Sequence, residues 1–117
     1  MISCSPHPDG RRLEITFTVT EPQRVDHRIN VVGDFNDWDP GAGRMHNGAG
    51  KHTATLALEP GRRYRFRYLS SHDGWFNDQD AGAYEFNEFG QRNCVLDLAI
   101  VDLAALHRRA AALQHHG

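Results

Sequence analysis

The feature that most constrains this chain is a strict two-residue alternation of apolar and polar side chains over residues 12–20. The apolar positions are Leu13, Ile15, Phe17 and Val19, and every residue between them is polar or charged. Successive side chains of a β-strand point to opposite faces, so this pattern predicts a strand with one buried face and one face in water.

Six further segments carry strand patterns, and turn signals separate them. They cover residues 27–33, 51–58, 63–69, 75–78, 84–86 and 92–99. The sequences Glu-Pro-Gly at 59–61 and His-Asp-Gly at 72–74 are typical of tight turns. About seven short strands with no helix pattern between them predict an all-β sandwich.

The length of the chain and the composition of its ends predict one domain with two extensions. A chain of 117 residues can build one hydrophobic core. We expect residues 1–11 to be a flexible leader, 12–99 the sandwich, and 100–117 a short C-terminal helical tail, with Asp102 as its N-cap. The helical stripe of the tail consists of Leu103, Leu106, Ala110 and Leu113. This stripe could dock on the sandwich or on a second copy, so a homo-oligomer stays open.

Charge and cysteine content bear on partners and compartment. The net charge is −2 with histidine neutral, so we expect no general attraction to nucleic acid or to anionic lipid. No run approaches the ~18 apolar residues of a membrane span, and the first residues do not resemble a signal peptide. Cys4 and Cys94 favour a reduced pair in a cytoplasmic protein, although a disulfide between them stays open.

The motifs do not indicate catalysis or metal binding. Aspartates cluster at 34–39 and at 73–80, but both clusters lie in turns rich in Gly and Asn, where Asp commonly bonds to local backbone. Glycoside hydrolysis needs two carboxylates at a fixed separation across the scissile bond. No pair among the eight histidines has zinc-ligand spacing. We therefore expect no enzyme activity, no metal and no cofactor.

Two tryptophans stand at turns and are the strongest candidates for a binding site. Trp38 lies among three aspartates and a proline, and Trp75 follows Asp73 and Gly74. Buried Trp is normally set among apolar neighbours, so a ring in so polar a turn usually has a ligand. The alternative is that each ring plugs an end of the sandwich, and for Trp75 the local sequence does not decide. Two exposed rings would suit a sugar chain, whose C–H faces stack on aromatic side chains.

Four motifs, taken in order, carry a resemblance to a known family. They are Val-Val-Gly-Asp-Phe-Asn-Asp-Trp at 31–38, Pro-Gly-Arg-Arg-Tyr-Arg-Phe-Arg-Tyr at 60–68, Asp-Gly-Trp at 73–75 and Asn-Glu-Phe-Gly-Gln-Arg-Asn at 87–93. Over about residues 12–99 the chain resembles carbohydrate-binding module family 48. This is the "early set" immunoglobulin-like domain of isoamylases and glycogen branching enzymes, and it also forms the glycogen-binding domain of the AMP-activated protein kinase β subunit.

The resemblance implies a non-catalytic module that binds α-1,4-linked glucan, such as glycogen or starch, across one exposed surface. Carried over residue by residue, it makes Trp38 and Trp75 the stacking rings. Arg65 and Asn93 would bond sugar hydroxyls, and Phe89 and Gln91 would meet the glucan from the late loop. It also suggests a glycogen-metabolising enzyme as a partner. The alternative, from another class, is a protein-interaction or regulatory sandwich with vestigial sugar binding, which would not need that set of residues.

Two departures from the family pattern limit what carries over. Ser70, Ser71 and His72 are inserted before the Asp-Gly-Trp motif, which leaves the distance between the two rings open. The catalytic barrel found in many relatives needs ~250 residues and is not in this chain, so the label of glycoside hydrolase does not transfer.

Overall fold

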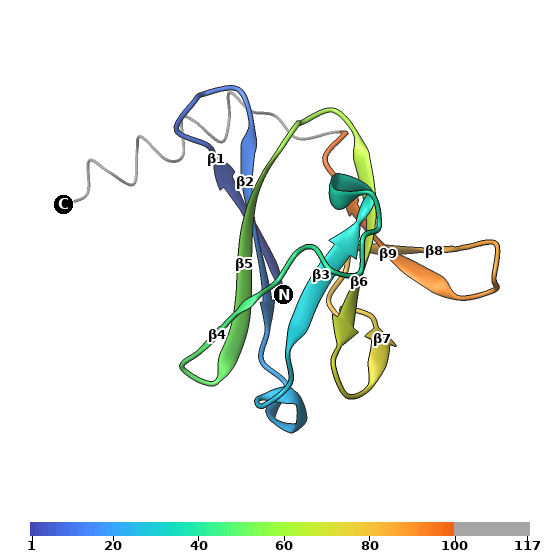
Figure 1. Cartoon of the computed structure of the whole chain (residues 1–117). Coiled ribbons are helices and arrows are strands. Elements are labelled where there is room, and N and C mark those ends of the chain that lie inside the picture. The colour runs from blue at the N-terminus through green and yellow to red at the C-terminus, as the bar shows by residue number, and fades with distance from the viewer. Residues whose placement is uncertain (100–117) are drawn as a thin grey trace.

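The computed structural model describes residues 1–99, which form nine strands in two antiparallel sheets (Figure 1). The first sheet has the order β1-β2-β5-β4, with strands at Ile2–Pro6, Leu13–Val19, Lys51–Leu58 and His46–Gly48. The second has the order β3-β6-β9-β8, with strands at Ile29–Gly33, Arg63–Ser70, Arg92–Asp97 and Ala83–Phe86, and β7 (Gly74–Phe76) also pairs with β6. Two short 3-10 turns, η1 and η2, cover Pro22–Arg24 and Asp34–Asn36.

The core lies between the two sheets, and the sequence alternation places its residues there. All four apolar positions of β2 are buried, and so are Tyr64, Phe66 and Tyr68 of β6. The Phe17 and Phe66 rings meet edge to face across the core, with their centroids 5.1 Å apart. The predicted β-sandwich is therefore confirmed. The predicted C-terminal helix lies outside the described residues.

Two edge strands differ from the expectation. We expected residues 1–11 to be a flexible leader, whereas Ile2–Pro6 forms β1 and pairs in register with β2, from Ile2 opposite Phe17 to Pro6 opposite Leu13. Likewise β4 lies between the strands predicted at 27–33 and 51–58, where no strand was expected, and it is joined to β5 by a tight turn in which Ala49 and Gly50 both have positive φ. An edge strand pairs on one side, so it needs little apolar patterning, and the patterns here were too weak to read.

The second sheet carries the hairpins that build the candidate site. In Figure 1 the β8–β9 hairpin projects from the body of the sandwich, and β7 lies beside β6. β7 pairs with Tyr68–Ser70 of β6, beyond Arg63–Phe66, the stretch that pairs with β9. Cys4 is exposed and Cys94 is buried in the core, and both are free thiols. Within residues 1–99 no helix is long and apolar enough to cross a membrane.

Candidate binding groove

An open groove of about 200 Å³ lies on the outer face of the second sheet. Its lining consists of Trp38, Arg67, Trp75, Asn87, Phe89, Gln91 and Asn93. These residues come from the turn after β3, from β6 and β7, and from the β8–β9 hairpin. The fold thus brings together five of the six predicted site residues. The exception is Arg65, and the groove adds Arg67 and Asn87.

Trp38 is held by a tight turn at the end of β3. Gly33 packs against β6 so closely that a Cβ there would lie 2.3 Å from the carbonyl oxygen of Arg65. The Asn36 side chain accepts from the Gly33 N–H and donates to the carbonyl oxygen of Val31, both at 3.0 Å. Asp37 and Trp38 then adopt left-handed φ values of 57° and 56°. Because this conformation is costly for residues other than Gly, the turn must be fixed by those bonds.

The Asp34 carboxylate orients the Trp38 ring. It accepts the indole N–H of Trp38 at 2.9 Å and the backbone N–H of Arg65 at 2.7 Å, and it pairs with the Arg65 guanidinium at 3.3 Å. Partial burial acts to raise the pKa of Asp34, but these bonds outweigh it and hold the pKa below its usual value. Asp34 therefore stays ionised and fixes the ring.

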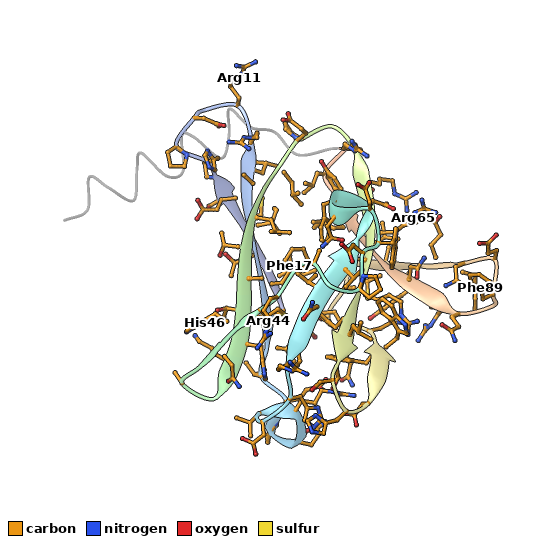
Figure 2. All side chains as sticks on the ribbon, viewed as in Figure 1. Arg11, Phe17, Arg44, His46, Arg65 and Phe89 are labelled. Atoms are coloured by element: carbon orange, nitrogen blue, oxygen red, sulfur yellow. The ribbon has the colours of Figure 1, made fainter. Side chains whose placement is uncertain are left out.

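Arg65 does not line the groove, because its guanidinium is drawn to Asp34. Arg65 and Arg67 both lie on the outer face of β6. The Asp34 carboxylate holds the guanidinium of Arg65, so Arg67 is the one that reaches the groove. Figure 2 shows Arg65 apart from Phe89, which stands at the outer end of the β8–β9 hairpin. Arg65 thus supports Trp38 through Asp34.

Arg67 is the basic residue of the groove. Its Nε donates to Asn77 Oδ1 at 2.7 Å and its Nη1 to Gln91 Oε1 at 2.8 Å. The guanidinium carbon lies 5.9 Å from the centroid of the Trp75 ring. Partial burial lowers the pKa of Arg67 from its usual value, but an arginine starts so high that it stays charged. The alternation of side chains in the sequence already placed Arg67 on the outer face of β6, and this was the signal by which the sequence could have identified it as a site residue.

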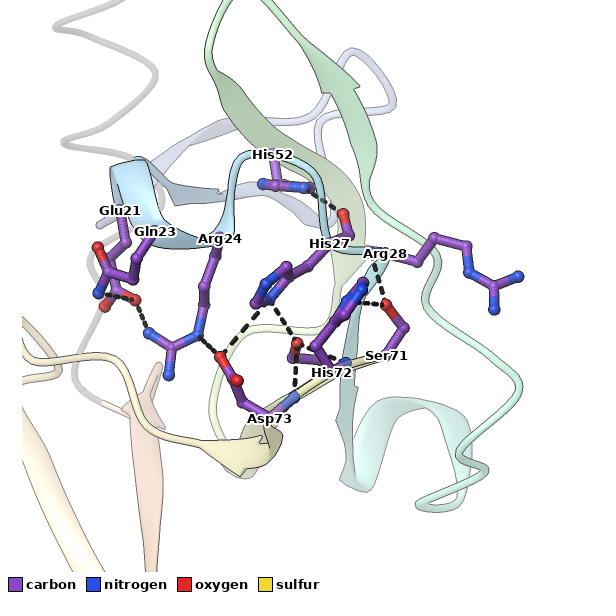
Figure 3. A network of polar contacts seen from close by, with 10 residues as sticks. Glu21, Gln23, Arg24, His27, Arg28, His52, Ser71, His72 and Asp73 are labelled. Atoms are coloured by element: carbon purple, nitrogen blue, oxygen red, sulfur yellow. Dashed lines mark hydrogen bonds and ion pairs between the residues drawn. The ribbon is translucent and has the colours of Figure 1, made fainter.

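Trp75 reaches the groove from β7, where it pairs with Leu69 of β6 and is 40% exposed. The turn before it is anchored by the inserted residues (Figure 3). Ser70 Oγ accepts the backbone N–H groups of His72 and Asp73 at 3.1 and 3.2 Å. The insertion therefore closes the hairpin tightly. The Trp38 and Trp75 ring centroids are 6.5 Å apart with a 55° angle between planes, which answers the question that the insertion left open.

The same anchor contains histidine, serine and aspartate, but their geometry does not match a nucleophilic triad. His27 Nδ1 lies 2.8 Å from Ser70 Oγ and 3.5 Å from Asp73, so both partners approach one ring nitrogen, whereas a triad uses both. The Asp73 carboxylate also pairs with Arg24, and the His27 and His72 rings stack at 4.2 Å (Figure 3). These contacts join the β6–β7 turn to the segment before β3. Among residues 1–99 no cluster of His, Cys, Asp and Glu is placed to hold a metal ion.

The β8–β9 loop is shaped by Asn87. Its Oδ1 accepts the backbone N–H groups of Phe89 and Gln91 at 2.9 and 3.1 Å, and its Nδ2 lies 3.4 Å from Asn93 Oδ1. These bonds leave the Phe89 ring 80% exposed beside the groove. Sequence reasoning missed Asn87, although an Asn at the start of a turn commonly bonds to the backbone N–H two residues on.

Comparison with known proteins places the fold. No family model and no curated protein sequence matches this chain. Among solved structures, the crystal structure of a maltogenic amylase from S. marinus is similar over 87% of this chain, at 22% sequence identity and a TM-score of 0.68. The match covers 16% of the amylase chain, so this chain spans about a sixth of its length. The sandwich is thus one that also occurs within an amylase.

Proposed function

We propose that this chain is a non-catalytic module that binds α-1,4-linked glucan in the groove, in the manner of family 48 carbohydrate-binding modules. The observation that carries this proposal is the pair of tryptophan rings, 6.5 Å apart, on a surface that also holds Phe89 and four polar side chains. Accessible aromatic rings beside fixed polar groups are typical of sugar-binding sites.

The geometry supports a curved chain in particular. The two rings are inclined by 55°, so they cannot both stack on successive sugars of a flat ribbon. Successive glucose faces of an α-1,4 chain turn relative to one another and can follow that angle. Arg67, Gln91 and Asn93 would then bond the hydroxyls at the edges of the sugars. Because Arg67 is already held by Asn77 and Gln91, little side-chain entropy would be lost on binding.

The lining of the groove supports binding without cleavage. None of its seven residues is acidic, whereas hydrolysis of a glycosidic bond needs a pair of carboxylates. We expect purified protein to release no reducing sugar from glycogen. A module of this kind would hold a glycogen-metabolising enzyme close to its substrate, and we expect such an enzyme as its partner in the cytoplasm.

The test is calorimetric titration with maltoheptaose, comparing wild type with Trp75→Ala and with Phe86→Ala. Phe86 is a control, because it is a 73% exposed aromatic residue on the β8–β9 hairpin, which also carries Asn93, but its side chain is on the strand face opposite to that of Asn93. Loss of a stacking ring should weaken binding by about tenfold, or about 1.4 kcal/mol. Phe86→Ala should bind like wild type.

Two results would overturn the proposal. One is no heat with millimolar maltoheptaose, which would favour a protein-interaction sandwich. The other is equal binding of cellohexaose, a flat β-1,4 chain, which would show that the inclined rings do not select the curved one.

A further inference from the structure

A second hollow lies on the same outer face, and the glucan groove does not include it. It has a volume of about 280 Å³ and is lined by Arg28, Asn30, Pro40, Arg44, Leu69, Ser70 and Ser71. Two of these residues are cationic, and none is acidic. The hollow is therefore positively charged in a chain whose net charge is −2.

The pairing of the strands places this hollow beside the groove. Leu69 of β6 pairs with Trp75 on one side and with Asn30 of β3 on the other, and Asn30 forms a bridge to Arg44. Neighbouring strands lie about 4.8 Å apart, so Asn30 is about 10 Å from Trp75 along this row. In the turn after β3, Trp38 lines the groove and Pro40, two residues later, lines the hollow. A chain that leaves the groove across Leu69 would enter the hollow.

The two guanidiniums are the groups that a ligand would find there. Neither Arg28 nor Arg44 has a side-chain hydrogen bond or an ion pair with any residue of the described 1–99. The other polar groups are in use. Asn30 Nδ2 donates to the carbonyl oxygens of Pro40 and Ala42, and Ser71 Oγ accepts the backbone N–H of Arg28. Figure 3 shows Arg28 extending away from the histidine network.

Four of the other eight arginines among residues 1–99 have an acidic partner. Arg12, Arg24, Arg63 and Arg65 each pair with at least one carboxylate. Arg28 and Arg44 lie on the same face of the sheet, because Arg44 forms a β-bridge to Asn30 and Arg28 precedes Asn30 by two residues. Two cations on one face without a carboxylate between them repel each other and would be stabilised by a bound anion.

We propose that Arg28 and Arg44 bind a phosphate monoester carried on an α-glucan whose neighbouring glucose units lie in the groove. This inference rests on the proposed function. A phosphate monoester is close to a dianion at pH 7, and the planar guanidinium matches its oxygens in a bidentate arrangement. Leu69, between the two arginines and Trp75, offers an apolar surface for the sugar that carries the phosphate. A neutral glucan has no charged group that could pair with the two guanidiniums.

The test compares maltodextrin bearing phosphate monoesters with the same material after phosphatase treatment. It uses wild type, the double variant Arg28→Gln/Arg44→Gln, and the charge-matched control Arg11→Gln/Arg62→Gln. Arg11 lies at the opposite end of the sandwich from Arg44 (Figure 2), and Arg62 stands in the β5–β6 turn. Wild type and control should bind the phosphorylated form about fivefold more tightly at low salt, the range expected of exposed charge pairs, and less so at high salt.

The Arg28→Gln/Arg44→Gln variant should lose this difference and still bind the dephosphorylated maltodextrin like wild type. Equal affinity of wild type for the two forms would overturn the inference and leave the proposed function standing. Binding of inorganic phosphate alone as tightly as the phosphorylated maltodextrin would also overturn it, because the glucan would then contribute nothing. Failure of wild type to bind either form would instead defeat the proposed function.

Discussion

The outer faces of the two sheets differ, although both arise from the same alternation of residues. On the first sheet the face carries short side chains, including Thr16 and Thr18 of β2 and Thr53 and Thr55 of β5, and the Thr16 and Thr55 hydroxyls meet at 2.9 Å. On the second sheet the equivalent positions hold arginine, asparagine and tryptophan. Within residues 1–99 the first face has no Phe, Tyr or Trp side chain, and the second has the groove.

The difference lies more in the turns than in the strands. The turn after β3 brings Trp38 over the second sheet, the β6–β7 hairpin brings Trp75, and the β8–β9 loop brings Phe89. The first sheet has no such turn among the described residues. Alternation therefore decides which side chains point outward, while the flanking turns decide whether an outer face becomes a binding surface.

The largest effect is expected where the two sheets meet. Phe66 lies beneath the groove and packs on Phe17 and Tyr68 at centroid distances of 5.1 and 5.8 Å. Phe66→Ala should reduce the free energy of unfolding by about 3–5 kcal/mol, because it leaves a cavity in a closely packed core. Urea denaturation would measure this loss. A loss below 1 kcal/mol would mean that the two sheets are not packed as described.

The next effect concerns the anchor of the Trp38 turn. Asp34→Ala leaves the indole N–H of Trp38 and the backbone N–H of Arg65 without their carboxylate, which should cost about 1–3 kcal/mol of stability. Maltoheptaose affinity should fall as well, because the ring loses its orientation. Stability and affinity should be measured on the same variant. A loss of stability with unchanged affinity would show that the orientation of Trp38 does not matter for binding.

Asp34 also gives a prediction for acid stability. Its folded-state pKa lies below the unfolded value of about 4, so its contribution is full above that value and is lost as pH falls through the folded pKa. Wild type should therefore lose stability relative to Asp34→Asn as the pH is lowered below about 4. Thermal melting of both proteins across this range would measure the difference, and parallel curves would contradict the prediction.

A smaller effect separates the two arginines of β6. Arg67→Ala should weaken maltoheptaose binding by about 0.5–1.5 kcal/mol, as expected for the loss of hydrogen bonds to sugar hydroxyls. Arg65→Ala should cost less, because Arg65 acts through Asp34 and the Arg65 backbone N–H remains. Calorimetry on both variants gives the order. The reverse order would mean that the sugar contacts Arg65, the residue that the family resemblance named, and not Arg67.

The smallest effect is expected on the outer face of the first sheet. Thr55→Ala removes an exposed hydroxyl that bonds to Thr16, so the change in stability should be within about 0.5 kcal/mol. Maltoheptaose affinity should be unchanged. Affinity weakened to the level of Trp75→Ala would mean that the first sheet also takes part in binding.

Several properties of this protein were readable in the sequence alone. The alternation in β2 and β6 identified their buried residues, and the polar turn around Trp38 predicted a ring at the surface, where the structure has it half-buried. For Trp75 the local sequence did not decide, and the prediction of an exposed ring came from the family resemblance; the ring is 40% exposed. Such properties are local, because a period of two specifies the face of a strand and a run of Asp and Asn specifies a turn.

Other properties depended on the tertiary structure. The distance between the two rings, the ion pair of Arg65 with Asp34 and the shared hollow of Arg28 and Arg44 each join residues from different strands or turns. The edge strand β1 belongs here too, since it exists through its pairing with β2. Strand register and turn geometry fix these relations, and no local pattern encodes the separation of two side chains that lie far apart along the chain.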